Sequence, residues 1–437
     1  MSLQQPIVEG PAARISNVLG LYKAEWLNGK LFELFTEPGY FGELKTKRPC
    51  VLIGGRGTGK TTVLRGLSYQ GQFALGNRDG ASISAWPFYG LYHRVNTNRV
   101  TAFRGPEITE ERWISHFAHY VNLTFCSLML EFTAWYELQT GIALEVDEAG
   151  LENVQATLGL RDLKTLRALS KEVEYLLLDF EGSINSIADS PSPRLSMQAA
   201  PVDALAKALI STPQLAGKQF FFLIDEFENY EDYQQRVLNT IIKHATSDYT
   251  FKVGVRELGW RQRATLNANE QLTSPADYAR ITIADVLDAS RFKAFAERVV
   301  AARLETGFDA EGPAPQPQAM FPSLTELDEA QLLLEGTDVE ALTLPLREAL
   351  SSDEYDGASK LLIGQLYFLK YWTDSHVGES YPAAPFRQHG GGMGQLREWV
   401  PGCPAAGAGF NGLEILADRA TSKPLRHAQR FFADYCT

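Results

Sequence analysis

A glycine-rich segment followed by a lysine and two threonines is the strongest chemical signal in the sequence. It matches the pattern GxxxxGK[ST] and lies between an apolar run that predicts a strand and a segment that predicts a helix. Its residues are Gly54, Gly55, Arg56, Gly57, Thr58, Gly59, Lys60, Thr61 and Thr62. Glycines let the backbone curl so that successive N–H groups, and the dipole of the following helix, point at one anion. The segment therefore predicts a binding loop for the phosphates of a nucleotide.

Two side chains of this phosphate loop have predicted roles. Lys60 supplies a positive charge to the β- and γ-phosphates, and the hydroxyl of Thr61 is a ligand for Mg²⁺. The alternative is a glycine-rich turn that contains a lysine and a threonine by chance. The flanking strand and helix disfavour that alternative, because they are the context that a phosphate loop requires.

A second apolar run ends in two carboxylates. Residues 220–224 are three phenylalanines, a leucine and an isoleucine, and Asp225 and Glu226 follow them. So dense a run predicts a central strand, and ligands bind at the C-terminal edge of such sheets. Asp225 is predicted to hold Mg²⁺ through its water shell, and Glu226 to polarise the attacking water. The alternative, two solvated loop acids, is disfavoured by the phosphate loop upstream.

The adjacent acids favour hydrolysis over transfer to a small acceptor. The sequence has no NKxD motif for guanine and no LSGGQ motif of transporter-type ATPases, so we expect ATP rather than GTP. A small-molecule kinase is disfavoured because no arginine-rich substrate lid is evident. The expected cofactors are ATP and Mg²⁺, and the expected activity is ATP hydrolysis.

Composition and charge limit the classes of protein and partner. The chain has 437 residues, 45% of them hydrophobic, and a net charge of −12, which fits a folded protein that does not coat nucleic acid unspecifically. Its four cysteines lie far apart and predict neither a disulfide framework nor a zinc site. With no apolar leader and no apolar stretch of roughly 20 residues, we expect a cytoplasmic protein without a membrane segment.

Short apolar runs alternate with helical patterns around these motifs. The predicted strands are residues 50–53, 88–95, 220–224, 251–255 and 280–283. The predicted helices between them are residues 61–68, 204–211 and 233–245. This alternation predicts an α/β fold, in which helices cover both faces of a parallel sheet.

A long helical segment interrupts the alternation. Within residues 107–144, large side chains recur at steps of three and four, which predicts an amphipathic helix with a buried aromatic stripe: Trp113, Phe117, Tyr120, Thr124, Leu128, Phe132, Trp135 and Leu138. Residues 151–180 extend this helical insertion. Such an insertion is either a surface that binds a partner or added structural bulk, and the sequence does not distinguish the two.

We expect three parts along the chain. Residues 1–48 form an N-terminal segment, residues 49–285 the nucleotide domain with its insertion at about 105–182, and residues 286–437 a helical domain. The helical domain is predicted from patterns at residues 291–304, 323–334, 342–351, 358–373 and 411–435. Stretches rich in Pro, Gly and Ser predict loops at residues 183–201, 306–323 and 377–412.

The order of phosphate loop, acidic strand, following strand and helical domain resembles the AAA+ ATPases. It is most similar to bacterial relatives of the origin-recognition and replication-initiator ATPases. Supporting stretches are KAEWL and PGYF within residues 23–41, NRVTAFRG at 98–105 and QQRVLN at 234–239. The resemblance spans about residues 15–305. It implies the sheet order 5-1-4-3-2, an N-terminal segment near the adenine, a helical lid, and neighbouring subunits that complete each other's sites.

The resemblance also implies cationic groups around the γ-phosphate. A polar sensor residue is expected after the fourth strand, but Arg256 stands there; either it contacts the γ-phosphate or it is an ordinary surface arginine. Arg426 lies where a second sensor arginine of the lid is expected. An arginine finger acting on a neighbouring subunit could be Arg261, Arg263 or Arg280, and the sequence does not choose among them.

Two functions stay open at this point. The first is an ATP-driven molecular switch, in a homo-oligomer or with a protein effector, that acts on DNA or on that effector; related bacterial proteins suggest defence against mobile DNA. The second is an ATP-stabilised scaffold for protein interactions with little or no hydrolysis. Direct DNA binding is not supported by the net charge, and no basic recognition helix is evident.

Overall fold

The computed structural model describes residues 30–187, 193–286 and 289–308. The chain divides into two compact units, residues 1–317 and 318–437, and every described residue belongs to the first. The predicted segment before residue 30, the predicted helices after residue 308 and Arg426 lie outside the described residues. The domain boundaries therefore stay predictions.

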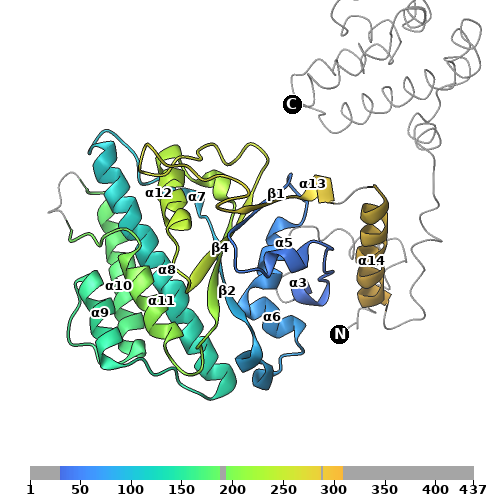
Figure 1. Cartoon of the computed structure of the whole chain (residues 1–437), viewed down its shortest axis with the longest axis horizontal. Coiled ribbons are helices and arrows are strands. Elements are labelled where there is room, and N and C mark those ends of the chain that lie inside the picture. The colour runs from blue at the N-terminus through green and yellow to red at the C-terminus, as the bar shows by residue number, and fades with distance from the viewer. Residues whose placement is uncertain (1–29, 188–192, 287–288, 309–437) are drawn as a thin grey trace, which may run out of the picture. The chain divides into compact units, whose positions relative to one another are not determined.

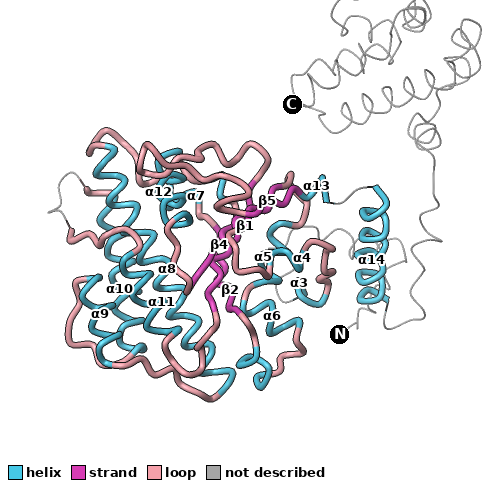
Figure 2. The backbone as a smooth tube through the Cα atoms, viewed as in Figure 1, coloured by secondary structure: helices cyan, strands magenta, loops and turns pink. Residues whose placement is uncertain are grey.

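Five parallel strands form the sheet. They are β1 (Cys50–Ile53), β2 (Phe88–Arg94), β3 (Gln219–Asp225), β4 (Tyr249–Val255) and β5 (Ala279–Thr282). The strand order is β2-β3-β4-β1-β5 (Figure 2). Read from β5, this is β5-β1-β4-β3-β2, the same succession as the 5-1-4-3-2 order that the resemblance implies. All five predicted strands are present, with small shifts at their ends, and the predicted parallel α/β sheet is confirmed.

The register brings the carboxyl ends of the strands to one edge. Ile53 at the end of β1 pairs with Val255 at the end of β4, and Arg94 at the end of β2 pairs with Asp225 at the end of β3. All seven residues of β3 are buried. The loops that follow β1, β2, β3 and β4 therefore meet at the same edge of the sheet.

Helices cover both faces of the sheet (Figure 1). On one side lie α8 (Glu110–Thr140), α9 (Glu148–Leu158), α10 (Leu166–Ile184), α11 (Ala200–Ile210) and α12 (Asp232–Lys243). On the other side lie α3 (Lys30–Glu33), α5 (Lys60–Leu67) and α6 (Tyr69–Leu75). The remaining described α-helices are α4 (Phe41–Leu44), α7 (Thr97–Val100), α13 (Ile283–Val286) and α14 (Ala289–Phe308). Two short 3-10 helices are η1 (Gly80–Ala85) and η2 (Phe227–Asn229).

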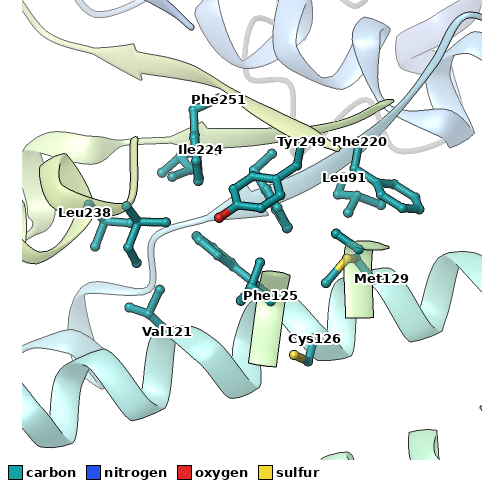
Figure 3. Close-up of a cluster of buried hydrophobic side chains, with 14 of the residues drawn as sticks. Leu91, Val121, Phe125, Cys126, Met129, Phe220, Ile224, Leu238, Tyr249 and Phe251 are labelled. Atoms are coloured by element: carbon teal, nitrogen blue, oxygen red, sulfur yellow. The ribbon is translucent and has the colours of Figure 1, made fainter. Parts of the chain in front are cut away.

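Strand β3 contributes to two hydrophobic cores because its side chains alternate between the faces. Phe220 and Phe222 belong to the core beneath α8, whereas Phe221 and Leu223 belong to the core beneath α5. Phe222 stacks on Phe125 of α8 with ring centroids 4.5 Å apart; Figure 3 shows Phe125 with other side chains of this core. A strand between two helical layers must be apolar on both faces, which explains its unbroken apolar run.

The insertion forms helices as predicted, with two differences. Most of the aromatic stripe of α8 is buried or partly buried, but the Leu138 side chain is 77% exposed, so its predicted core position is wrong. It lies in the last turn of α8, just before Gly141 ends the helix at φ 71°. The predicted helical segment 151–180 is two helices, because Gly159 at φ 77° ends α9.

Candidate nucleotide site

The phosphate loop connects β1 to α5 and is fixed to the neighbouring strand. The backbone N–H of Gly54 donates to the carbonyl of Val255 at 3.2 Å. A Cβ atom at position 54 would lie 2.6 Å from Oγ1 of Thr58, so the loop requires glycine there. Gly59 has φ 85°, a left-handed conformation that side chains disfavour. The sequence motif thus corresponds to a specific curled backbone.

The start of α5 offers backbone donors to an anion. Its N-cap, Gly59, makes no side-chain capping hydrogen bond, so the first amide groups of the helix have no side-chain acceptor from the cap. Lys60 arches over the loop, and its Nζ donates to the carbonyls of Gly54 at 2.7 Å and Gly55 at 2.8 Å. Residues 55–58, which include Arg56, are exposed, and Thr62 lies in the first turn of α5. This arrangement fits the phosphates of a nucleotide.

Thr61 and Asp225, the two predicted magnesium ligands, are in contact. Oγ1 of Thr61 donates to Oδ2 of Asp225 at 2.7 Å, although the two residues are far apart in the chain. Tyr92 of β2 donates its hydroxyl to the same Oδ2 at 3.0 Å, and the backbone N–H of Glu226 donates to Oδ1 at 3.0 Å. A hydroxyl and a carboxylate side by side are the oxygen ligands that Mg²⁺ takes together with water and phosphate, so these residues fit the ion.

Burial and neighbouring groups shift the pKa values of Asp225 and Lys60 in opposite directions. Burial raises the pKa of Asp225, and hydrogen bonds from Thr61 and Tyr92 oppose the rise. Burial lowers the pKa of Lys60, and the negative charges of Glu228 and Asp225 oppose that shift. A half-buried lysine among acids suits a position where phosphate oxygens replace part of the negative charge.

Glu226 follows β3 in a left-handed backbone conformation with φ 61°. Its Oε1 accepts a hydrogen bond from Nη2 of Arg94 at 2.9 Å, and its Oε2 accepts one from Nδ2 of Asn229 at 3.2 Å. Both carboxylate oxygens of the predicted catalytic acid thus accept bonds from the protein. The structure places Glu226 at the sheet edge with Asp225; its role in catalysis stays a prediction.

Arg256, the residue at the sensor position, is held by an acid. Its Nε lies 2.8 Å from Oε1 of Glu228, and its backbone N–H donates to Oε2 of Glu228 at 3.2 Å. Its positive charge also lowers the pKa of Lys60, which puts the arginine within electrostatic reach of the phosphate loop. Whether Arg256 contacts a γ-phosphate stays a prediction.

Sequence reasoning missed three residues of the site: Tyr92, Arg94 and Glu228. Tyr92 and Arg94 lie at the end of β2, which is the neighbour of β3. Their chemistry was visible in the sequence as a tyrosine and an arginine at the end of a predicted strand. Their contacts depend on which strand lies beside β3, and no local motif encodes that neighbour.

One face of α12 ties the loops of this edge together. Gln234, Gln235 and Asn239 are fully buried, although their side chains are polar. Nε2 of Gln234 donates to the carbonyl of Val100 at 2.8 Å, and Nε2 of Gln235 donates to the carbonyl of Gly259 at 3.0 Å. Asn239 donates to two carbonyls in the 262–264 segment, both at 2.9 Å. The QQRVLN stretch therefore connects the loops that follow β2 and β4.

Intramolecular contacts occupy two of the three finger candidates. Arg261 donates from Nε to Asp232 at 2.7 Å and from Nη1 to the carbonyl of Glu228 at 3.0 Å. Arg263 donates to the hydroxyl of Tyr278 at 2.8 Å and lies over the ring of Trp260. Arg280 is exposed on β5. Among the three, this favours Arg280, whose role in a neighbouring subunit stays a prediction.

A cavity of about 320 Å³ lies apart from this cluster, at the start of α12. It is lined by Arg104, Glu110, Glu231, Asp232, Tyr233, Arg236 and Gln262. Neither the phosphate loop nor Asp225, Glu226 or Glu228 lines it, and its arginines pair with Glu231 and Glu110. The cavity is therefore separate from the phosphate loop.

Metal-binding clusters and membrane-spanning helices are both absent from the described ranges. Within residues 30–187, 193–286 and 289–308, no group of three or more His, Cys, Asp or Glu residues is arranged to hold a metal ion. In the same ranges, no helix is both long and apolar enough to cross a membrane. Cys50 and Cys126 are buried free thiols.

Comparison with known proteins identifies the family. The model of the ORC-CDC6-like family matches residues 17–389, which is most of the chain and includes the whole sheet and the phosphate loop. No curated protein and no solved structure matches the chain. The resemblance to origin-recognition ATPases is therefore confirmed. The chain belongs to the ORC-CDC6-like family and is an origin-recognition/Cdc6-like AAA+ ATPase.

Proposed function

We propose that the chain binds Mg²⁺ and ATP at the phosphate loop, hydrolyses the ATP, and acts as a molecular switch. The observation that carries this proposal is the 2.7 Å contact between Thr61 and Asp225, beside Lys60. It joins a hydroxyl, a carboxylate and an ammonium group at the carboxyl edge of a parallel sheet. Few functions other than nucleotide binding require that combination behind a curled glycine loop.

The residues divide the chemistry among them. Bound Mg²⁺ would neutralise charge that develops on the transferred phosphoryl group. Lys60 exchanges its hydrogen bonds to the carbonyls of Gly54 and Gly55 for contacts with phosphate oxygens. Thr61 and Asp225 supply the oxygen ligands of Mg²⁺. Glu226 orients the attacking water and accepts its hydrogen bond. Arg256 is the proposed cationic contact of the phosphates within the described residues.

The switch would act through the loops at the sheet edge. The backbone segments after β2, β3 and β4 are tied to one another through α12, so a change at the phosphates is expected to shift them together. We propose a homo-oligomer or a protein effector as the partner that senses this change. DNA as the target, and defence against mobile DNA as the process, rest on the resemblance alone.

One observation favours the scaffold alternative. Both carboxylate oxygens of Glu226 already accept hydrogen bonds, one of them from an arginine. A water molecule must therefore compete with these two donors for the Glu226 carboxylate. Slow hydrolysis with a structural role for ATP is therefore the second candidate function.

Turnover measurements separate the two functions. ATP hydrolysis is measured for wild type, Lys60→Ala and Glu226→Gln, with and without duplex DNA, together with mass by light scattering. Lys171→Ala, which removes an exposed lysine of α10, is the matched control. The switch predicts turnover in wild type and in the control, loss in both site variants, and a change of mass with ATP. ATP binding without turnover or change of mass supports the scaffold instead.

A further inference from the structure

The loop after β3 carries a third acid, Glu228, that neither the phosphate loop nor the magnesium cluster explains. Its side chain is only 11% exposed. One carboxylate binds two groups of a single residue, because Oε1 contacts Nε of Arg256 at 2.8 Å and Oε2 accepts from the backbone N–H of Arg256 at 3.2 Å. Such a paired contact fixes both the start and the end of the arginine side chain.

Glu228 and Arg256 lie beside the phosphate loop. Arg256 directly follows Val255, whose carbonyl accepts the N–H of Gly54, the first glycine of the loop. The ion pair between Glu228 and Arg256 is therefore linked to the phosphate loop through the end of β4.

The surrounding loops hold Glu228 in place. Gly259 closes the turn that begins at Arg256, with its N–H donating to the Arg256 carbonyl at 3.0 Å. A Cβ atom on Gly259 would lie 2.5 Å from Cβ of Glu228, so glycine is required for this close packing. Nη1 of Arg261 donates to the backbone carbonyl of Glu228 at 3.0 Å. The acid is therefore built into the junction of the loops after β3 and β4.

The contact leaves the phosphate-binding part of the guanidinium group available. A guanidinium carries five N–H donors, and the ion pair with Glu228 is made at Nε. Among the described residues, no acceptor is recorded for the two Nη groups of Arg256, and the side chain is half exposed. Two adjacent Nη groups suit the oxygens of a terminal phosphate, which they bind as a fork.

We propose that Glu228 is a positioning residue that aims Arg256 at the γ-phosphate and so lets the site distinguish ATP from ADP. This inference rests on the proposed nucleotide function and adds a residue to it. The carboxylate takes no part in bond breaking. It fixes the position of Nε, so that the Nη groups of Arg256 contact the γ-phosphate when ATP is bound.

Binding of two nucleotides tests the inference in the full chain. Affinities for MgATPγS and MgADP are measured by calorimetry for wild type, Glu228→Gln, Glu228→Ala and Arg256→Ala. Glu257→Gln is the matched control, because Glu257 is the exposed acid next to Arg256. We expect the Glu228→Ala and Arg256→Ala variants to lose about tenfold in ATPγS affinity, with ADP affinity changed less than about twofold. Glu228→Gln, which keeps an acceptor oxygen but no charge, is expected to lose less.

A double variant shows whether the two residues act together. If Glu228 works through Arg256, the Glu228→Ala/Arg256→Ala protein binds ATPγS no more weakly than either single variant. Equal losses for ATPγS and ADP would mean that Glu228 only supports the loop, and would overturn the inference. Unchanged ATPγS affinity in Glu228→Ala overturns it as well. Absence of ATPγS binding by wild type would instead overturn the nucleotide function itself, so the two failures are distinct.

Discussion

At the scale of single residues, Tyr92 illustrates how the site is organised around Asp225. Thr61 and Tyr92 both donate to Oδ2 of this buried aspartate, at 2.7 and 3.0 Å. If the Thr61 hydroxyl turns to Mg²⁺, Tyr92 stays as the side-chain donor that orients the carboxylate. Residues in this position behind a metal ligand affect metal affinity strongly, often without touching the ion.

Tyr92→Phe is therefore expected to raise the Mg²⁺ concentration needed for half-maximal ATP turnover, on the order of tenfold. The ring, its packing and its contact with Arg65 are preserved, so the stability should fall by only about 1 kcal/mol. A magnesium titration of turnover measures the effect. Tyr175→Phe, in which the tyrosine is 62% exposed on α10, is the control. An unchanged magnesium requirement in Tyr92→Phe would show that Tyr92 does not contribute to magnesium binding.

Arg94 is expected to restrain Glu226. The pair is 2.9 Å long, with side chains 46% and 28% exposed, so it contributes little to stability and its effect should be on turnover. Arg94→Ala frees one oxygen of Glu226, the proposed catalytic carboxylate, and we expect basal ATP hydrolysis to rise about two- to fivefold. The increase in ATP hydrolysis should disappear in the double variant Arg94→Ala/Glu226→Gln. It should also be absent in the control Arg167→Ala, which removes an exposed arginine. A drop in turnover would show instead that Arg94 supplies a needed charge.

At the scale of elements, the strands could be predicted because their signals are local. The apolar run of β3 and the glycine motif after β1 are each read within a few residues. Asn239 could not be predicted in the same way, because it looks like a polar surface residue of an amphipathic helix. Its environment is made by the loop after β4, which returns to α12 only in the folded chain.

Asn239→Ala should be strongly destabilising. Its amide donates to two carbonyls at 2.9 Å and its Oδ1 accepts from Nε1 of Trp260 at 3.1 Å, all in a fully buried position. Truncation leaves the buried indole N–H of Trp260 and two part-buried carbonyls without these partners, so we expect a loss of roughly 2–4 kcal/mol. Urea denaturation measures the loss. Asn269→Ala, an exposed asparagine of the same loop region, should change stability by less than about 0.5 kcal/mol.

Lys252 joins the middle of β4 to the segment before β1. It is fully buried, its Nζ donates to the carbonyls of Thr46 and Arg48, and it lies 4.5 Å from the centroid of the Phe221 ring. Burial lowers the pKa of Lys252 to about 8, and the neighbouring Cys50 thiol opposes the shift. Burial raises the pKa of Cys50 to about 11, so this thiol is neutral near pH 8.

The lowered pKa makes stability depend on pH in the alkaline range. Between about pH 8 and the ordinary lysine pKa of 10.5, the unfolded chain binds this proton and the folded chain does not. Stability contributed at this site therefore rises between about pH 8 and pH 10.5, by up to about 1.4 kcal/mol per pH unit, and it is lost as the pH falls back through 8. Urea denaturation from pH 7 to 9.5 should show that the free energy of unfolding of wild type increases relative to that of Lys252→Met. Lys171→Met should track wild type, and parallel curves for all three proteins would contradict the prediction.

At the scale of the whole molecule, the sequence is sufficient for the fold class and the family but not for the relations between loops. The phosphate loop, Asp225 and the strand pattern led to the correct sheet and to the family that residues 17–389 match. Arg94 and Glu228 became part of the site only once the strands were placed side by side. A contact between loops depends on strand order and register, whereas a motif depends on consecutive residues.

Because the loops after β1, β3 and β4 meet at one edge, nucleotide binding should stabilise the sheet unit as a whole. At 100 times its dissociation constant, MgATPγS should add about 2.7 kcal/mol and raise the Tm of this unit by about 5 °C. Differential scanning calorimetry of the full chain measures the shift, with Mg²⁺ alone as the baseline. Lys60→Ala should show almost no shift, whereas Lys171→Ala should match wild type. An equal shift in Lys60→Ala would mean that the nucleotide binds elsewhere, because no other described lysine contacts the carbonyls of the phosphate loop.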